Sequence, residues 1–245
     1  METRLIIDEP ARGSWNMAVD ETLLQSAGPG GGSTLRFYQW NEPTLSLGYF
    51  QQIETRGEHP PSSNLPVVRR TTGGGAIVHD RELTYSFVTP IRNRFSPAAH
   101  DFVKQFHQSL IATFAERGIE ASLCGNAAAE NKSEPFLCFQ RRGSLDILVR
   151  NAKVVGSAQR RLQGAMLQHG SILLARSPNA AALPGLAELS GTTVIHCELV
   201  QDWSQRLGKQ FGFEFAASSL TETELSLALS IERTRFADQR WTRKR

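Results

Sequence analysis

Residues 69–80 read RRTTGGGAIVHD and place three consecutive glycines between two apolar runs. The run before the glycines, PVVRR, and the runs after them, AIVHD and ELTYSFV, have the composition and alternation of β-strands. A glycine triplet costs backbone entropy, so it is tolerated where a chain turns sharply or where a ligand lies against bare main chain. The feature therefore predicts a strand–loop–strand unit whose loop is either a plain turn or one wall of a binding site.

The surroundings of this glycine loop exclude the usual nucleotide-binding loops. Neither G-x-G-x-x-G nor G-x-x-x-x-G-K-[ST] is present. The loop also leads into a strand, whereas phosphate groups bind where a glycine loop opens a helix. Any ligand of this loop is therefore expected to be something other than a cradled nucleotide phosphate.

The first half of the chain predicts a helix followed by several strands. Ser14 is expected to cap a helix with an apolar stripe at helical spacing. TLRFYQW and TLSLGYF are expected as strands joined by a hairpin turn at 41–43. A long helix is then expected from Pro97 to Gly118, with its apolar residues on one stripe.

The second half continues with an irregular polar stretch, CGNAAAENKSEPFLCFQRRG, and three successive strands in SLDILV, KVVGSAQRR and GAMLQHGSILL. Two closing helices are expected, the second starting at Thr221 with Glu224 completing a capping box. Strands and helices do not alternate along the chain. We therefore expect an α+β fold with a mixed, mainly antiparallel sheet and flanking helices.

The composition is that of an ordinary soluble domain and argues against several kinds of partner. The 245 residues are 40% apolar and 21% charged, with a net charge of +3, so a nucleic-acid partner is disfavoured. No apolar run reaches the roughly 20 residues of a membrane span, and the start METRLIIDEP does not resemble a signal peptide. Three cysteines without C-x-x-C spacing predict neither a disulfide framework nor a metal site, and the expected location is the cytoplasm.

RRTTGGGAIVHD resembles the signature of the lipoate and biotin protein ligase superfamily, and in particular of its lipoate-protein ligase A family. LSLGYFQ at 45–51 and KVVGSAQRRLQGAMLQHGSILL at 153–174 agree with that family in order and spacing. The resemblance implies the catalytic fold of the superfamily, which is related to class II aminoacyl-tRNA synthetases. Ligases of the family commonly carry an accessory C-terminal domain, whereas here we expect a single catalytic domain over 1–245 that closes with short helices and carries no such domain.

In the family, the glycine loop and the lysine block line a tunnel for a medium-length acyl chain. By resemblance, the substrate-binding positions here are Arg70, Thr72, Gly73, Gly74, Gly75, His79, Gly156, Ser157 and His169, and Lys153 is a catalytic position. Glycines admit a ligand to the backbone, and a lysine amine can bind a carbonyl oxygen or stabilise negative charge. Taken alone, Lys153 would be read as a solvated strand residue and the glycines as a bulge.

EPFLCFQRRG places Cys138 where octanoyltransferases of the Bacillus type, a subset of the superfamily, carry a nucleophilic cysteine. The resemblance implies that Cys138 takes octanoyl from octanoyl-acyl carrier protein and passes it to a lysine of a lipoyl-type domain, such as glycine cleavage H protein or a 2-oxoacid dehydrogenase E2. Such a transfer starts from a thioester and needs no ATP, metal or other cofactor. A cysteine suits it, because a thiolate both attacks and leaves readily. Cys124 and Cys197 are interpreted as structural.

Three alternatives remain open at this point. An ATP- and Mg-dependent lipoate-protein ligase is one, although ligases have an Asn-Asp pair where this chain has Leu145 and Asp146. An amidotransferase that moves octanoyl between lipoyl-type proteins would use the same cysteine chemistry. A non-catalytic acyl-binding homologue is the third, favoured if Cys138 is buried and inert.

Overall fold

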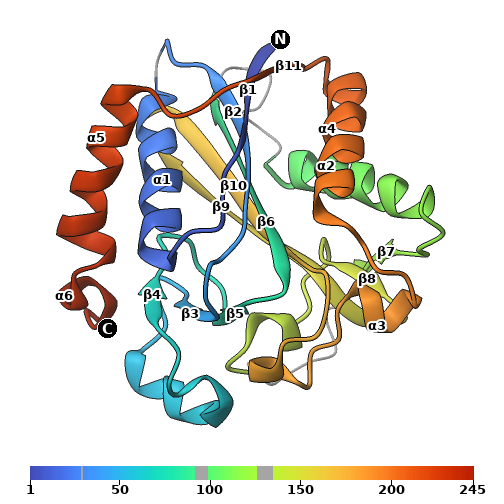
Figure 1. Cartoon of the computed structure of the whole chain (residues 1–245), viewed down its shortest axis with the longest axis horizontal. Helices are drawn as coiled ribbons and strands as arrows, with labels where there is room; N and C mark the ends of the chain where they lie inside the picture. The colour runs from blue at the N-terminus through green and yellow to red at the C-terminus, as the bar shows by residue number, and fades with distance from the viewer. Residues whose placement is uncertain (29, 92–98, 126–134) are drawn as a thin grey trace.

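The computed structural model describes residues 1–28, 30–91, 99–125 and 135–245. An eight-stranded sheet runs through the molecule in the order β11-β1-β2-β6-β10-β9-β8-β7, and a three-stranded sheet has the order β4-β3-β5 (Figure 1). The strands of the large sheet are β1 (Glu2–Ile7), β2 (Ser33–Tyr38), β6 (Glu82–Pro90), β7 (Ser122–Leu123), β8 (Ile147–Val149), β9 (Ala152–Leu162), β10 (Ala165–Leu173) and β11 (Glu214–Ala217). Those of the small sheet are β3 (Thr44–Leu47), β4 (Val67–Arg69) and β5 (Ile77–His79).

The large sheet is mixed and mainly antiparallel. β1 pairs in parallel with β2 and β11, and every pair from β2 through β6, β10, β9 and β8 to β7 is antiparallel. In the small sheet β3 is parallel to β4 and antiparallel to β5. The α+β class predicted from the sequence is confirmed.

Helices cover both faces of the large sheet (Figure 1). On one face lie α1 (Gly13–Ser26) and α5 (Glu222–Ile231), and on the other lie α2 (Ala99–Ala115) and α4 (His196–Phe211). The shorter helical segments are η1 (Ile53–Glu58), η2 (Pro60–Ser62), η4 (Cys138–Gln140), η5 (Pro178–Ala180), α3 (Leu186–Ser190), η6 (Glu232–Phe236) and α6 (Gln239–Thr242). Among the described residues, no helix has the length and apolar character needed to cross a bilayer.

The central strand β6 is buried on both faces, and this explains why both sides carry helices. Leu83, Tyr85 and Phe87 point to the core beneath α2 and α4, while Val88 packs with α1 and α5. The aromatic stripe expected on α2 lies in the first of these cores, where Phe102, Phe106, Leu110 and Phe114 are buried. Each Å² of apolar surface removed from water stabilises a fold by about 25 cal/mol, so these two cores are the main source of stability.

Several local predictions are confirmed. Thr221 caps α5, accepting from the backbone N–H of Glu224, whose carboxylate accepts from the N–H of Thr221 in return. Tight turns join β8 to β9 and β9 to β10, with Asn151 and Gly164 in the left-handed region. Gly118, at φ +71°, follows α2 as predicted. Pro97 and the polar stretch 126–134 lie outside the described residues.

Two local predictions are wrong. Ser14 does not cap α1, because the helix begins at Gly13 and the Ser14 hydroxyl instead donates to Glu232, 2.6 Å away. The strands around residues 41–43 do not form a hairpin, since β2 belongs to the large sheet and β3 to the small one. The crossing between sheets creates the space in which the candidate site lies.

Candidate active site

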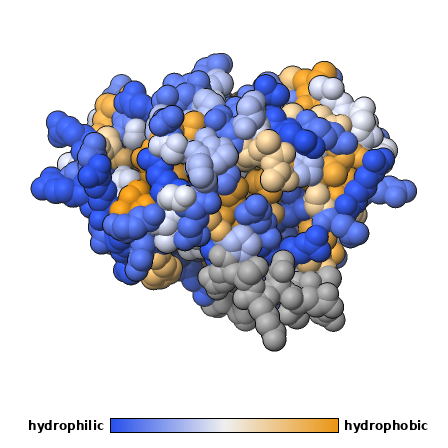
Figure 2. All heavy atoms as spheres, turned by 90° about the horizontal axis from the view of Figure 1, so that it is seen from below, coloured by the Kyte–Doolittle hydropathy of each residue, from blue (hydrophilic) through white to orange (hydrophobic). Residues whose placement is uncertain are grey.

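A cavity of about 240 Å³ is bounded by both sheets, the glycine loop and the segment that begins at Cys138. Of the predicted site residues, those that line it are Arg70, Gly73, Gly74, His79, Cys138, Gly156, Ser157 and His169. Thr72, Gly75 and Lys153 stand directly behind this lining, hydrogen-bonded to or packed against it. An apolar cavity of about 150 Å³ admits a benzene ring, so this cavity has room for a short acyl chain. The face seen in Figure 2 is mainly hydrophilic, with several apolar patches across it.

The glycine loop packs directly onto the backbone that carries the cysteine. The N–H of Ala76 donates to Phe136 O at 2.9 Å, and the N–H of Cys138 donates to Ala76 O at 2.7 Å. A Cβ on Gly75 would stand 3.0 Å from the nitrogen of Cys138, so only glycine permits this approach. Gly74 has φ +94°, a conformation that other residues rarely adopt. Gly75 therefore permits the close contact with the Cys138 backbone, and Gly74 permits the turn of the loop.

Cys138 lies on the cavity wall, and Lys153 contacts it from behind the wall. The Nζ atom of Lys153 lies 3.7 Å from Sγ of Cys138, donates to the Cys138 carbonyl at 3.2 Å, and pairs with Asp146 at 2.8 Å. Gly156 makes room for this arrangement, because a Cβ there would stand 2.7 Å from Lys153 Cε. Cys138 itself is half-buried and accessible from the cavity. The pair can therefore hold a thiolate beside an ammonium group.

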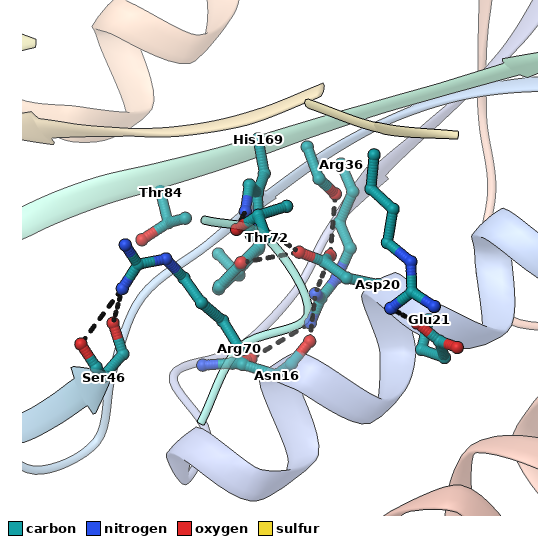
Figure 3. A network of polar contacts seen from close by, with 12 residues as sticks. Asn16, Asp20, Glu21, Arg36, Ser46, Arg70, Thr72, Thr84 and His169 are labelled. Carbon is teal, nitrogen blue, oxygen red and sulfur yellow. Dashed lines mark hydrogen bonds and ion pairs between the residues drawn. The ribbon is translucent and has the colours of Figure 1, made fainter. Parts of the chain in front are cut away.

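Arg70 is buried at the base of the glycine loop and braces it. Its guanidinium donates to the carbonyls of Gly73 and Gly75, at 2.8 and 2.7 Å, and to the carbonyl of Ser46 at 3.1 Å. Burial lowers the pKa of Arg70 to about 10, so it is still a cation at neutral pH. Figure 3 shows the Arg70 side chain reaching Ser46 from the loop.

His79 is held on all sides. Its ring stacks on Trp40 with centroids 3.8 Å apart, Nε2 lies 2.7 Å from the Ser46 hydroxyl, and Nδ1 lies 2.7 Å from Glu82. Burial lowers the pKa of His79, so the ring is neutral at neutral pH. A neutral ring that donates from Nδ1 to Glu82 accepts at Nε2 from Ser46. One carboxylate oxygen of Glu82 accepts three hydrogen bonds, because Thr84 and Ser171 also donate to it.

His169 belongs to a second buried network, seen in Figure 3. Its Nε2 atom lies 2.7 Å from the Thr72 hydroxyl, and its Nδ1 atom lies 3.3 Å from Asp20 on α1. Asp20 also accepts from Arg36 at 2.8 Å and from the Tyr38 hydroxyl at 2.9 Å. Burial alone would raise the pKa of Asp20, but the hydrogen bond from His169 and the charge of Arg36 outweigh it and lower this pKa. Asp20 is thus an ionised anchor for the cavity wall.

His107 of α2 supports the cavity from behind. Its Nδ1 atom donates to Leu145 O at 2.6 Å, and its Nε2 atom lies 3.0 Å from the hydroxyl of Ser157. Burial lowers the pKa of His107, so its Nε2 accepts a hydrogen bond at neutral pH. Leu145 precedes Asp146, which pairs with Lys153. The His107 side chain therefore fixes both the loop that carries Asp146 and the hydroxyl of Ser157.

Sequence reasoning missed a set of buried polar residues around the cavity: Asp20, Arg36, Tyr38, Glu82 and His107. A signal for two of them is present in the sequence, because Arg36 interrupts the apolar strand TLRFYQW and His107 lies within the aromatic stripe of α2. Charged groups in such positions are rarely buried unless paired. Of the other cysteines, Cys124 is buried and Cys197 is exposed on α4, and neither lines the cavity. Among the described residues, no three His, Cys, Asp or Glu side chains gather as a metal-binding group.

The sequence model of the family described as "Lipoyl protein ligase A/B catalytic domain" matches residues 12–183. The chain belongs to this family. It is 32% identical to octanoyltransferase LipM of Brevibacillus brevis, over 99% of both chains. It is also 32% identical to octanoyltransferase LipM of Symbiobacterium thermophilum, over the full length of both.

Solved structures agree on the fold. The crystal structure of a lipoate-protein ligase A bound with ATP superposes with a TM-score of 0.82, covering 99% of each chain at 22% identity. At that identity the likeness shows the architecture and not the reaction. The resemblance on which the sequence analysis rested is confirmed.

Proposed function

We propose that this chain is an octanoyltransferase that moves an octanoyl group from a carrier-protein thioester, through Cys138, to a lysine of a lipoyl-type domain. Relatives named octanoyltransferase LipM match it over the whole chain. The observation that carries the proposal is the position of Cys138 Sγ, on the cavity wall and 3.7 Å from the amine of Lys153. A thiol beside a cation is the arrangement that favours the nucleophilic thiolate.

The transfer takes two displacements at one carbonyl carbon. In the first, Cys138 Sγ bonds to the carbonyl carbon of the octanoyl thioester, the carbon–sulfur bond to the carrier breaks, and the carrier thiolate leaves and takes up a proton. In the second, the acceptor lysine nitrogen, as the free amine, bonds to the same carbon, the bond to Cys138 breaks, and the nitrogen loses one proton. Lys153 stays close to Sγ in both steps and stabilises its negative charge.

The two displacements need no nucleotide. One thioester replaces another at nearly equal energy, and an amide then forms downhill, so the donor already supplies what ATP supplies to a ligase. The residue before Asp146 supports this choice, since it is Leu145 where ligases of the family have asparagine. Asp146 is engaged by Lys153 and by the N–H of Gly143 at 2.6 Å. We accordingly propose that the reaction runs without ATP or a metal ion.

The proposed donor and acceptor are an octanoyl-acyl carrier protein and a lipoyl domain or H protein. Carrier proteins of this kind are acidic, which suits the net charge of +3 of this chain. We propose a cytoplasmic location, because Cys124, Cys138 and Cys197 are all free thiols, as expected in a reducing compartment.

An intact-mass experiment tests the proposal. The protein is incubated with octanoyl-acyl carrier protein in the absence of ATP, and the expected result is an octanoyl adduct that a lipoyl domain then removes. The adduct should be lost in Cys138→Ser and kept in Cys124→Ser. Acyl transfer at full rate by Cys138→Ser contradicts the proposal. Transfer that requires free lipoate and ATP identifies a ligase, and an adduct formed only from octanoylated H protein identifies an amidotransferase.

A further inference from the structure

Arg70 carries a buried positive charge that is met only by neutral oxygens. The residue is 3% exposed, and its hydrogen bonds go to the carbonyls of Ser46, Gly73 and Gly75 and to the Ser46 hydroxyl. Within the described part of the chain, no carboxylate pairs with its guanidinium. Burying an ion is unfavourable unless an opposite charge lies close to it. The charge of Arg70 is therefore available to an anion in the cavity that it lines.

Gly74 lies between Arg70 and the thiol of Cys138. The point where a Cβ of Gly74 would stand is 3.1 Å from Nη2 of Arg70 and 3.8 Å from Sγ of Cys138. The guanidinium and the sulfur thus border the same side-chain-free space above one glycine. The charge of a Cys138 thiolate also raises the pKa of Arg70, against the larger lowering by burial.

Among the described residues, the charged groups near Sγ come from four segments. Lys153 on β9 is 3.7 Å away and shares its charge with Asp146. Arg70 approaches from the end of β4, and Arg141 follows η4 and donates from Nε to Pro135 O at 2.6 Å. In the part of the chain that the structure describes, Lys153 and Asp146 offset each other, and the charge of Arg70 is left over for a thiolate to offset.

Arg69 offers a comparison within the same sequence. It is also fully buried and also donates to backbone carbonyls, those of Gly48, Gln51 and Thr242. It does not line the cavity, because its side chain faces the C-terminal segment. Two adjacent arginines thus brace the backbone in the same manner, and one of them faces the thiol.

We propose that Arg70 is a second cation for the thiolate of Cys138, acting across the gap above Gly74 and in addition to Lys153. The inference concerns the thiol itself and rests on the proposed function only in taking Cys138 as the reacting group. Arg70 keeps its proton throughout. Negative charge develops on Sγ when the thiol releases its proton, and in the first displacement it passes through the acyl oxygen to the leaving carrier thiolate. In the second displacement the charge returns to Sγ. The guanidinium stabilises the states in which Sγ carries the charge.

The test is the rate at which iodoacetamide alkylates Cys138 as a function of pH, followed by mass measurement of the peptide that contains it. Only the thiolate reacts, so the pH midpoint reports the charge around Sγ. Arg70→Gln removes a nearby cation, so its midpoint should lie about one pH unit higher than that of the unaltered protein. Alkylation at neutral pH should be about tenfold slower. Arg70→Lys should recover part of the shift. Arg69→Gln, which removes an equally buried arginine, should leave the midpoint unchanged.

Two outcomes overturn the inference. One is an unchanged midpoint in Arg70→Gln, and the other is an equal shift in Arg69→Gln, which would assign the effect to loosening of the loop. Thermal unfolding of each variant identifies loss of folding, and Arg70→Lys provides a folded comparison that keeps the charge. The assay contains no acyl donor. Failure of octanoyl transfer by the unaltered protein would therefore reject the proposed function without affecting this result.

Discussion

Lys153 and Asp146 form an ion pair, with Nζ and Oδ2 2.8 Å apart, and the same Nζ lies 3.7 Å from the Cys138 sulfur. Asp146→Asn keeps an oxygen for the N–H of Gly143 but removes the charge that holds the lysine. We expect octanoyl-adduct formation to slow by about tenfold or more, since each 1.4 kcal/mol of lost stabilisation is a factor of ten. Time-resolved intact-mass measurement gives the rate of adduct formation. Asp101→Asn, at an exposed carboxylate of α2, serves as control. An unchanged rate in Asp146→Asn would show that the pair does not position Lys153.

The glycine loop allows a comparison of two neighbours. A Cβ on Gly73 would find nothing closer than the Phe50 ring at 3.8 Å, so Gly73→Ala should be as stable as the unaltered protein. Gly74→Ala would adopt φ +94°, at a cost of about 1–2 kcal/mol, and would place its methyl group 3.1 Å from Arg70. We expect Gly74→Ala to lose most of its acylation rate. Urea unfolding and adduct formation, measured on both variants, check this, and equal behaviour would refute it.

The buried histidines predict how stability depends on pH. Burial lowers the pKa of His107 and of His79. An unfolded histidine titrates near pH 6.5, so below that pH the unfolded chain binds more protons than the folded one. Stability should therefore fall as the pH drops toward about 5, by up to about 1.4 kcal/mol per pH unit for each histidine.

His107→Asn tests the contribution of one histidine, because asparagine can still donate to Leu145 O without titrating. We expect urea unfolding of this variant to show a shallower loss of stability with acid, with the remaining slope supplied by His79 and His59, whose pKa burial also lowers. A slope equal to that of the unaltered protein would mean that His107 is not neutral in the folded state.

The pair between Asp20 and Arg36 lies in the core beneath the cavity, with both side chains at most 3% exposed. Asp20→Ala leaves Arg36 with Asp8 as its remaining carboxylate and should destabilise the fold by about 3–5 kcal/mol. Asp202→Ala removes a partly exposed pair with Arg117 and should cost at most about 1 kcal/mol. Chemical denaturation distinguishes the two, and a small effect at Asp20 would show that the pair can be dispensed with.

The sequence was informative wherever a local pattern determines structure. The strand–glycine–strand unit, the stripe of α2 and the capping box at Thr221 all follow from spacing and side-chain chemistry within a few residues, and all are present. Cys138 and Lys153 were predicted through family resemblance, and the structure places them in contact. Their proximity could not be derived from the chain alone, since it depends on how η4 packs against β9.

What the sequence did not reveal depends on long-range packing. Asp20 and His169 are 149 positions apart and meet only because α1 packs against β10. The apparent hairpin around 41–43 failed for the same reason, as the strand after the turn finds its partners in β4 and β5. Short-range turn chemistry cannot specify which of two sheets a strand joins.

The hydrogen bond from the N–H of Cys138 to Ala76 O, at 2.7 Å, has a consequence for the transition state. In many acyl-transfer enzymes the backbone N–H of the nucleophile is one donor of the oxyanion hole. Here that donor is already committed to the glycine loop, in the same bond that fixes the cysteine to it. The negative oxygen of a tetrahedral intermediate must therefore be stabilised by other groups. Substituting side chains of the cavity wall should then change the reaction rate of thioamide or ester substrates that probe oxyanion stabilisation.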